Sequence, residues 1–435
     1  MKIFCSGIGG IGLSAYAAYQ RAAGHEVSGS DQEEGIVTAD LQAQGISVSF
    51  RQDGSAIPPD TDLFVYTLAL PEGHPELQRA KELVIRQQSY FEALGDLTCG
   101  SELIAVCGTH GKSSTTAMAA KVLIEAGQDP SVILGTRMKD LGDRNWRRGT
   151  SSLFLAEACE YRRSFLHLSP RVILLTNTDG DHFDAFKDME DYRDAFRAFI
   201  GKLPPGGVLI LHGSDRSTGE FRKIAEQGDV RVTDADQLPL PELQIPGKHM
   251  RENARLVLAL AEVLHLDRSR TDISLRNYAG SWRRMEIRGE TRGGVLVIDD
   301  YGHHPTEIKA TLRALREAYP TRRLVCVFQP HTHDRTIKLY PDFLGAFSDA
   351  ALVIIPNIYD ARPHTEERSM QVPALVSDIA RESHVEACDG KSLEGTIALL
   401  RTNILRKGDL LVTMGAGDVW RIANSQPLIM SLEQP

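Results

Sequence analysis

Short apolar runs alternate with longer amphipathic segments along most of this 435-residue chain. Runs of four to eight residues that are rich in Val, Ile and Leu are typical of buried strands. Segments of more than ten residues with apolar positions three or four apart are typical of helices that cover a sheet. Strands that alternate with helices predict βαβ units and parallel sheets, so we expect an α/β protein.

The predicted elements fall into three blocks. The first has strand-like runs at 2–7, 25–31 and 62–67, with a helix over 13–23. The second has runs at 102–108, 151–158 and 171–177, a helix over 113–126 and an amphipathic helix within 245–264. The third has runs at 294–300, 323–329, 351–357 and 409–415. We therefore predict a Rossmann-like domain over 1–98, a central parallel-sheet domain of the P-loop ATPase type over 99–280, and a second Rossmann-like domain over 281–435.

The composition of the chain argues against two classes of binding partner, nucleic acids and membranes. The chain has 49 basic and 58 acidic side chains and a formal charge of -9, which disfavours bulk nucleic-acid binding. No apolar run approaches the length of a membrane span, and the first residues enter a strand without a leader-like pattern. The six cysteines show no metal-finger spacing. We expect a cytoplasmic protein that binds neither nucleic acid nor membrane.

The first glycine-rich turn is GIGGIG, residues 7–12, between a predicted strand and a predicted helix. Its glycines fit G-x-G-x-x-G, which allows a diphosphate to approach the N-terminus of the helix. Asp31 closes the next strand, where a carboxylate can accept from a ribose hydroxyl. This pattern favours an NAD-like or UDP-like ligand; the alternative is that the glycines only allow close strand–helix packing.

The second glycine-rich turn is GTHGKSS, residues 108–114. It lacks the first glycine of the G-x-x-x-x-G-K-[ST] pattern, because Val106 stands there. Gly108 and Gly111 still expose backbone N–H groups, Lys112 can reach the β- and γ-phosphates, and Ser113 can bind Mg²⁺. The turn therefore predicts triphosphate binding, with a helix cap and a solvated lysine as the alternative.

Acidic and basic side chains follow several other predicted strands. Glu157 ends one strand, and DGDHFD at 179–184, which contains His182, follows the next. Ligands gather at the carboxyl ends of parallel strands, so Glu157 is a candidate metal ligand or a structural ion-pair partner. For His182, the alternative to binding a metal is a role as a helix cap or a hydrogen-bonding side chain.

In the third block, two polar segments follow predicted strands: DDYGHHPTE at 299–307 and FQPHTHDRT at 328–336. We expect them to bring a tyrosine, several histidines and Arg335 to one edge of the sheet. Arg283 and Arg284 are either an anion clamp or solvated side chains.

Nine motifs occur together in one order: GIGGIG, GTHGKSS, EACEY, DGDHFD, IPGKHMRENA, GSWRRME, DDYGHHPTE, FQPH and GAGD. Their order and spacing resemble the Mur ligase family over nearly the whole chain. The resemblance implies an ATP-dependent ligase with three domains. The member of the family that the chain resembles most uses ATP to convert the carboxylate of UDP-N-acetylmuramate to an acyl phosphate, with release of ADP. The amine of L-alanine then attacks the acyl phosphate to give an amide and phosphate.

The resemblance also implies roles for particular residues. The first loop would bind the UDP substrate, and the second would bind ATP, with Asn253 and Arg284 completing the ATP site. The implied UDP-substrate residues are Gly9, Gly10, Ile11, Gly12, Ser30 and Asp31. The implied ATP residues are Gly108, Thr109, His110, Gly111, Lys112, Ser113, Ser114, Asn253 and Arg284.

Catalysis and metal binding are implied in the same way. The amino acid would be bound by Tyr301, His303 and Arg335. The metal ligands would be Ser113, Glu157 and His182, for two Mg²⁺ ions with Mn²⁺ as a substitute. The implied catalytic residues are Lys112, Glu157, His182, His303 and Arg335. The expected partners are the three small-molecule substrates, in a monomer or a homodimer.

Two segments depart from the family pattern. Thr332 stands where many relatives have Arg, which shifts recognition of the alanine carboxylate toward Arg335, and GSWRR replaces the more familiar GVKRR. A related ligase that joins a tripeptide to UDP-N-acetylmuramate is one alternative, although its relatives usually have Asp where Cys159 stands. A nicotinamide-dependent oxidoreductase explains only the first loop, and a non-catalytic nucleotide-binding regulator does not need Lys112, Ser113 and Glu157 together.

Overall fold

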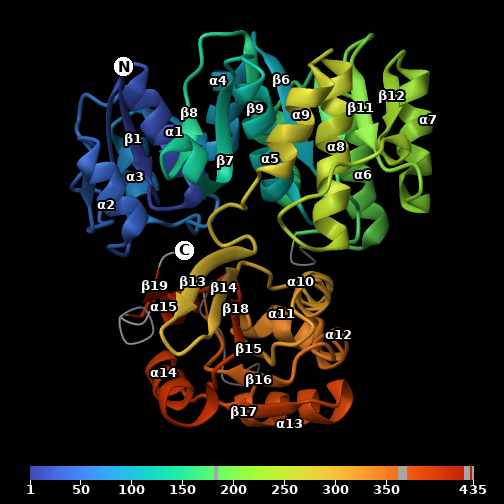
Figure 1. Ribbon diagram of the computed structural model, residues 1–435. Coiled ribbons are helices and arrows are strands. Elements are labelled where there is room, and N and C mark those ends of the chain that lie inside the picture. Colours follow the sequence, from blue (N-terminus) through green and yellow to red (C-terminus); the bar gives the residue numbers. More distant parts are fainter. Residues whose placement is uncertain (181–184, 361–369, 426–431, 434–435) are drawn as a thin grey trace. The chain divides into compact units, whose positions relative to one another are not determined.

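The computed structural model describes residues 1–180, 185–360, 370–425 and 432–433, so the predicted ligand His182 lies outside the described residues. The chain divides into two compact units. One consists of residues 1–242 and 252–278, and the other of residues 243–251 and 279–435. Figure 1 shows helices and strands alternating through both units. The α/β class predicted from the apolar pattern is confirmed.

The first sheet has five parallel strands in the order β3-β2-β1-β4-β5. Its strands are β1 (Lys2–Ser6), β2 (Glu26–Ser30), β3 (Ser47–Ser49), β4 (Leu63–Tyr66) and β5 (Arg86–Ser89). Its helices are α1 (Ile11–Ala22), α2 (Ile36–Ala43), α3 (Pro75–Glu82) and α4 (Tyr90–Thr98). The strand order reverses beside β1, and the first glycine-rich loop leaves the carboxyl end of this strand. This is the Rossmann-like arrangement that the sequence predicts.

The second sheet has seven strands in the order β12-β11-β10-β6-β9-β7-β8, and only β8 runs antiparallel to its neighbour among its described strands. The strands are β6 (Glu102–Cys107), β7 (Ser131–Met138), β8 (Arg144–Arg147), β9 (Leu153–Glu157), β10 (Val172–Leu175), β11 (Val208–Leu211) and β12 (Arg231–Asp234). The helices are α5 (Lys112–Glu125), α6 (Met189–Ile200), α7 (Gly219–Gln227), α8 (Lys248–Val263) and α9 (Arg268–Arg276). The sequence did not indicate the β7–β8 hairpin.

The first two sheets share one apolar core. Buried residues of the first sheet and α1, such as Ile3 and Leu13, belong to the same cluster as Leu103 and Phe154 of the second sheet. The ring of Tyr19 on α1 meets Trp146 of β8 edge-on at 6.3 Å. Helix α1 therefore packs on both sheets, and the two predicted domains form one compact unit.

The third sheet belongs to the second unit and has the order β17-β16-β15-β18-β14-β13-β19. The strands are β13 (Glu286–Thr291), β14 (Leu296–Asp300), β15 (Leu324–Phe328), β16 (Leu352–Ile355), β17 (Glu386–Asp389), β18 (Leu410–Met414) and β19 (Leu432–Glu433). The helices are α10 (Pro305–Ala318), α11 (His333–Lys338), α12 (Tyr340–Leu344), α13 (Val372–Ser383), α14 (Leu393–Leu399) and α15 (Trp420–Ala423). Strands β14 to β18 are parallel, and β13 pairs antiparallel with β14 and with β19.

The predicted domain boundaries at 98/99 and 280/281 lie in connections between sheets and stay predictions. Within the described ranges, no helix has both the length and the apolar character needed to cross a lipid bilayer.

Candidate functional site

The second glycine-rich loop connects β6, in the middle of the second sheet, to the N-terminus of α5. Gly108 and Gly111 have φ of +131° and +82°, which L-residues with side chains rarely adopt. A Cβ atom would lie 2.0 Å from Thr176 Oγ1 at Gly108 and 2.5 Å from Asn253 Oδ1 at Gly111. Glycine is thus required at both positions, and the loop leaves the first N–H groups of α5 available to an anion.

Lys112 is the first residue of α5, and its ammonium group turns back over the loop. It donates to the backbone oxygens of Gly108 and Thr109, the latter at 3.0 Å, and lies 3.0 Å from Glu160 Oε2. Burial opposes the charged form of this lysine, but the adjacent carboxylates, Glu160 above all, raise its pKa above the ordinary value. The structure therefore places an ammonium group whose charged form is favoured against the loop that leads into α5.

Glu157 and Ser113 form the second part of this site. Ser113 Oγ donates to Glu157 Oε2 at 3.1 Å, and the N–H of Gly135 on β7 donates to Oε1 at 2.5 Å. A Cβ on Gly135 would lie 2.5 Å from Oε2, so glycine at this position permits the contact. A hydroxyl and a carboxylate at the N-terminus of a phosphate-type loop are the oxygen donors that Mg²⁺ prefers, and the pair fits this ion.

The described residues contain no group of three or more His, Cys, Asp and Glu side chains arranged to hold a metal ion. The third predicted metal ligand, His182, lies outside the described residues. Of the three predicted metal ligands, Ser113 and Glu157 are therefore the two whose geometry the structure describes.

Asn177, which follows β10, holds the loop in place and was not singled out from the sequence. Its Oδ1 accepts from the N–H of His110 at 3.1 Å, and its Nδ2 donates to the oxygen of His110 at 3.1 Å. The hydroxyl of Thr109 is 2.7 Å from the buried hydroxyl of Tyr192. The predicted ATP residues Thr109 and His110 are therefore anchored by α6 and by the segment that follows β10. The only signal for Asn177 was its place at a strand end.

Two further predicted ATP residues lie beside this loop. Ser114 is in the first turn of α5 and is buried. Asn253 is buried on α8, next to Gly111. The structure thus brings the predicted central residues together at the carboxyl ends of β6 and β9, which are adjacent strands.

The first glycine-rich loop is held by β2. The N–H groups of Gly7 and Ile8 donate to the Ser30 oxygen at 2.8 and 2.9 Å, and the N–H of Gly9 donates to Asp31 Oδ2 at 2.7 Å. Asp31 Oδ1 also accepts from the N–H of Gln32 at 2.8 Å. The carboxylate of Asp31 therefore shapes the loop. Its predicted contact with a ribose hydroxyl stays a prediction.

Ser30 is fully buried, and its hydroxyl donates to Glu76 Oε2 at 2.7 Å. Ser6 Oγ donates to the same oxygen, and Glu76 itself has no exposed surface. Ser30 thus acts on the loop through its backbone oxygen, while its side chain faces the protein interior. Glu76, on α3, was not identified from the sequence, because nothing near it in the chain marks it as a partner of two strand ends.

The rest of the first loop leads directly into α1. Gly10 is the N-terminal cap of α1, Ile11 is its first residue, and no side chain caps the helix. A Cβ on Gly12 would lie 2.9 Å from the ring of Tyr90. The loop and helix therefore provide a second N-terminus that suits a phosphate group.

In the second unit, three of the predicted residues form a row. The guanidinium carbon of Arg284 is 4.7 Å from the centre of the Tyr301 ring, and the His303 ring meets Tyr301 edge-on at 5.5 Å. His331 and Tyr359 extend the row. The ring centres of His303 and His331 are 5.8 Å apart, and those of His331 and Tyr359 are 5.7 Å apart. Neither His331 nor Tyr359 was assigned a role from the sequence, although His331 lies in the FQPH motif.

Arg335, the remaining predicted residue, is on the short helix α11, just beyond His331. Thr332 caps this helix by accepting from the N–H of Arg335 at 3.4 Å and has a φ of +65°, which is strained for a β-branched residue. The cap fixes where α11, and with it Arg335, begins.

Arg283 has a structural role. It is buried, its Nε is 3.0 Å from Asp299 Oδ2, and its Nη1 and Nη2 donate to the backbone oxygens of Gly417 and Gly415. Burial raises the pKa of Asp299 to about 6, although Arg283 and Thr413 act in the opposite direction. The idea of a clamp formed by both arginines is therefore wrong for Arg283, whose donors are taken by the protein, and only Arg284 remains a candidate.

Models of the Mur ligase family match three successive stretches of the chain. They are the Mur ligase family, catalytic domain, over residues 2–101; the Mur ligase middle domain over 106–237; and the Mur ligase, glutamate ligase domain, over 283–417.

Curated relatives and solved structures agree with these matches. A UDP-N-acetylmuramate–L-alanine ligase of Clostridium novyi is 36% identical over 446 residues, covering 97% of this chain and 96% of the relative. The corresponding ligase of Clostridium perfringens is 34% identical, with the same coverage. The crystal structure of the UDP-N-acetylmuramate–alanine ligase MurC from Thermotoga maritima has a TM-score of 0.82 at 26% identity, covering 98% of this chain and 97% of that one. A murein peptide ligase from Psychrobacter arcticus has the same fold, with a TM-score of 0.74 at 22% identity over 99% and 98% of the two chains.

Proposed function

This chain belongs to the Mur ligase family, and we propose that it joins L-alanine to the carboxylate of UDP-N-acetylmuramate with conversion of ATP to ADP and phosphate. The product is UDP-N-acetylmuramoyl-L-alanine, a precursor of peptidoglycan. The observation that carries the proposal is the grouping of Lys112 and Ser113, at the N-terminus of α5, with Glu157, at the end of β9, in a unit that has a second phosphate-type loop before α1. The named relatives support the choice of substrates.

The two loops divide the binding task. The loop at 7–12 and the N-terminus of α1 bind the diphosphate of the sugar nucleotide, together with Ser30 and Asp31, which hold this loop. The loop at 108–114 binds the phosphates of ATP, with Asn253 beside it. An acid and a triphosphate are thus held by a single compact unit.

Activation of the acid follows from this arrangement. A carboxylate is a poor acyl donor, and transfer of the γ-phosphoryl group to one of its oxygens gives an acyl phosphate with a good leaving group. The charged Lys112 neutralises the phosphoryl group as it moves, so catalysis rests mainly on positioning and electrostatics. Ser113, Glu157 and His182 are the proposed ligands of two Mg²⁺ ions, for which Mn²⁺ can substitute. Bound Mg²⁺ supplies further positive charge to the phosphates.

The second unit supplies the acceptor side in this proposal. Tyr301, His303 and Arg335 orient L-alanine, and Arg335 binds its carboxylate because a guanidinium matches a carboxylate with two parallel hydrogen bonds. Arg284, stacked on Tyr301, contacts the γ-phosphate. The amine attacks the acyl carbon, the tetrahedral intermediate collapses, and the C–O bond to phosphate breaks to leave the amide.

The proposed setting follows from the substrates. ATP and a sugar nucleotide are cytoplasmic metabolites, so we place the enzyme in the cytoplasm, as a monomer or a homodimer. Among the alternatives, the nicotinamide-dependent oxidoreductase is inconsistent with the family to which the chain belongs.

Phosphate release by the purified protein tests the proposed function. ATP, UDP-N-acetylmuramate and L-alanine together must give phosphate at a rate that falls to background when any one is omitted. Replacing L-alanine with glycine, L-serine or a tripeptide compares acceptors in the same assay. Faster turnover with the tripeptide than with L-alanine would contradict the proposal in favour of the recycling ligase.

A further inference from the structure

The β7–β8 hairpin contacts the first turn of α1, the helix that follows the first glycine-rich loop. Asn145 on β8 is buried, and its Nδ2 donates to the Ile11 backbone oxygen at 2.6 Å. The same nitrogen is 3.1 Å from Ser14 Oγ, which itself donates to the Ile11 oxygen at 2.9 Å. Because Ile11 is the first helical residue, these bonds fix the peptide at the N-terminus of α1.

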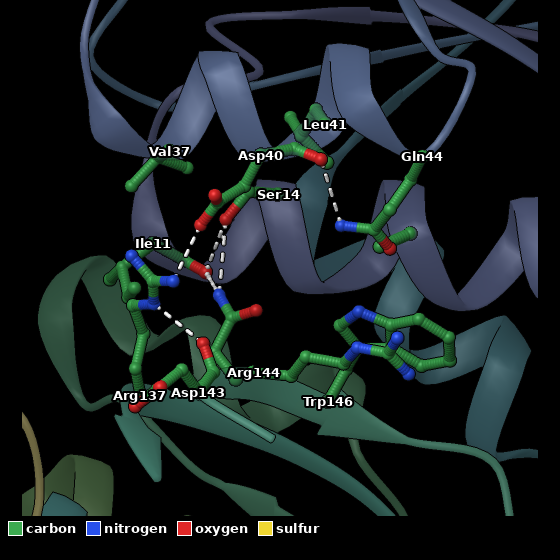
Figure 2. A pocket seen from close by; sticks show the side chains of 12 residues that line it. Ile11, Ser14, Val37, Asp40, Leu41, Gln44, Arg137, Asp143, Arg144 and Trp146 are labelled. Atoms are coloured by element: carbon green, nitrogen blue, oxygen red, sulfur yellow. Dashed lines mark hydrogen bonds and ion pairs between the residues drawn. The ribbon is translucent and has the colours of Figure 1, made fainter. Parts of the chain in front are cut away.

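A second link joins the hairpin to α2. Arg137 at the end of β7 forms an ion pair with Asp40 of α2, with 2.6 Å between Nη2 and Oδ2. Its Nε donates to the backbone oxygen of Asp143 at 2.7 Å, which also braces the turn of the hairpin. Figure 2 shows these side chains around a pocket that Ile11 and Ser14 border from α1. The hairpin is thus tied to both helices of the first sheet that it faces.

Strand β7 also reaches the site around the ATP loop. Gly135, two residues before Arg137 on β7, donates to Glu157 Oε1 at 2.5 Å. Glu157 in turn accepts from Ser113, in the first turn of α5. Hydrogen bonds on both strands of the β7–β8 hairpin therefore connect the N-terminus of α5 to the N-terminus of α1.

We infer that Asn145 is a positioning residue for the sugar nucleotide: its amide holds the N-terminus of α1 on the hairpin that carries the Glu157 contact. This inference rests on the proposed function, in which α1 binds the diphosphate and Glu157 belongs to the ATP site. Transfer of a phosphoryl group requires the acid and the γ-phosphate to be in line, and a misplacement of about 1 Å can reduce the rate by about 100-fold. A hairpin bonded to both N-termini supplies this alignment without touching either substrate.

The test uses Asn145→Asp in the full-length enzyme. Aspartate keeps the shape of the side chain but replaces its N–H donor with an acceptor, which repels the Ile11 oxygen. We expect the Kd of UDP-N-acetylmuramate, measured by calorimetry, and its KM to rise roughly tenfold, which lies within the range for a buried hydrogen-bonding group that loses its partner. The unfolding temperature is expected to fall, because the same buried hydrogen bond is lost in the folded protein, whereas the Kd of ADP is expected to stay at the wild-type value. Arg148→Ala, an exposed neighbour on the hairpin, is the matched control and must leave both affinities unchanged.

Three results would overturn the inference. Wild-type affinity of Asn145→Asp for UDP-N-acetylmuramate would do so, and so would an equal loss of affinity for both ligands, because that indicates a structural role alone. If Asn145→Asp does not fold, Ser14→Ala is measured instead, and it must show a smaller loss of affinity that is again selective for the sugar nucleotide. Unaltered binding of UDP-N-acetylmuramate by Ser14→Ala would be the third contradicting result. A wild-type enzyme that bound no UDP-N-acetylmuramate would instead contradict the proposed function.

Discussion

The ammonium nitrogen of Lys112 lies 3.0 Å from Oε2 of Glu160, a side chain with no exposed surface. A buried carboxylate needs a partner, and Lys112 supplies it while also bonding to two oxygens of its own loop. The pair keeps the ammonium charged and close to the N-terminus of α5. In the proposed function, nucleotide phosphates would meet a positive group that is already in place, which is the property that phosphoryl transfer needs.

Lys112→Ala is expected to lower kcat by about 100- to 1000-fold, because it removes a charge that stabilises the transferring phosphoryl group. The measurement is the steady-state release of phosphate. Since the substitution removes the lysine that pairs with the buried Glu160, the double variant Lys112→Ala/Glu160→Gln removes both charges of the pair and must be equally inactive. Lys202→Ala, at an exposed position of the same unit, is the control. Turnover of the double variant near the wild-type rate would show that Lys112 has no part in catalysis.

Gly135→Ala is expected to raise the Mg²⁺ concentration needed for half-maximal activity. The new methyl group would lie 2.5 Å from Glu157 Oε2, so the carboxylate must move away from Ser113. The measurement is phosphate release as a function of Mg²⁺ concentration. Gly219→Ala is a matched control, because a Cβ there meets no atom within 4 Å. The same Mg²⁺ dependence in Gly135→Ala and wild type would count against Glu157 as a metal ligand.

Arg335→Ala is expected to raise the KM for L-alanine, with a smaller effect on the KM for ATP, because the substitution removes the proposed partner of the alanine carboxylate. Initial rates at varied L-alanine measure this effect. Lys338→Ala is the control on the same helix, where Lys338 pairs with Asp334 at 2.9 Å on a partly exposed surface. Unaltered alanine kinetics in Arg335→Ala would assign the carboxylate to another residue.

The pKa of Asp236 predicts how the stability of the first unit depends on pH at its acidic end. Partial burial favours its protonated form, but hydrogen bonds from Ser214 and His212 lower the pKa of Asp236 to about 2. Because the ordinary value is about 3.9, the folded state binds this proton less tightly than the unfolded state does. The stability from this group is thus complete above about pH 4 and is lost as the pH falls toward 2.

The measurement compares the unfolding temperatures of wild type and Asp236→Asn across this range. Wild type should be the more stable protein at pH 5, and the difference should shrink progressively between pH 4 and pH 2. A difference that stayed constant over that interval would mean that the Asp236 carboxylate does not titrate as its hydrogen bonds imply.

The elements predicted correctly from the sequence are those that are formed by residues close together in the chain. The strand–loop–helix patterns at 2–23 and 102–126 are local, so the loops, the helix starts and the ends of strands such as Glu157 followed from pattern alone. The predicted helix at 113–126 differs from α5, Lys112–Glu125, by one residue at each end.

Contacts across the fold could not be obtained in this way. Glu160 lies 48 residues from Lys112, Asn177 67 from His110 and Asn145 134 from Ile11. Each is a polar side chain whose role depends on which strands become neighbours. The β7–β8 hairpin was missed because β8 has only four residues and a largely polar sequence, RNWR. The sequence also could not show that three side chains considered as ligand-binding candidates form hydrogen bonds to other groups of the protein. These are Ser30, Asp31 and Arg283.

The fate of the carboxylate oxygens of UDP-N-acetylmuramate tests the central claim most directly. With both oxygens labelled as ¹⁸O, transfer of the γ-phosphoryl group to one of them, followed by attack of the amine, breaks the C–O bond and leaves that oxygen on phosphate. We predict that each phosphate released in the presence of L-alanine carries a single ¹⁸O atom, as measured by mass spectrometry, and that the amide keeps the other. Unlabelled phosphate accompanying amide formation would contradict activation of the acid by ATP.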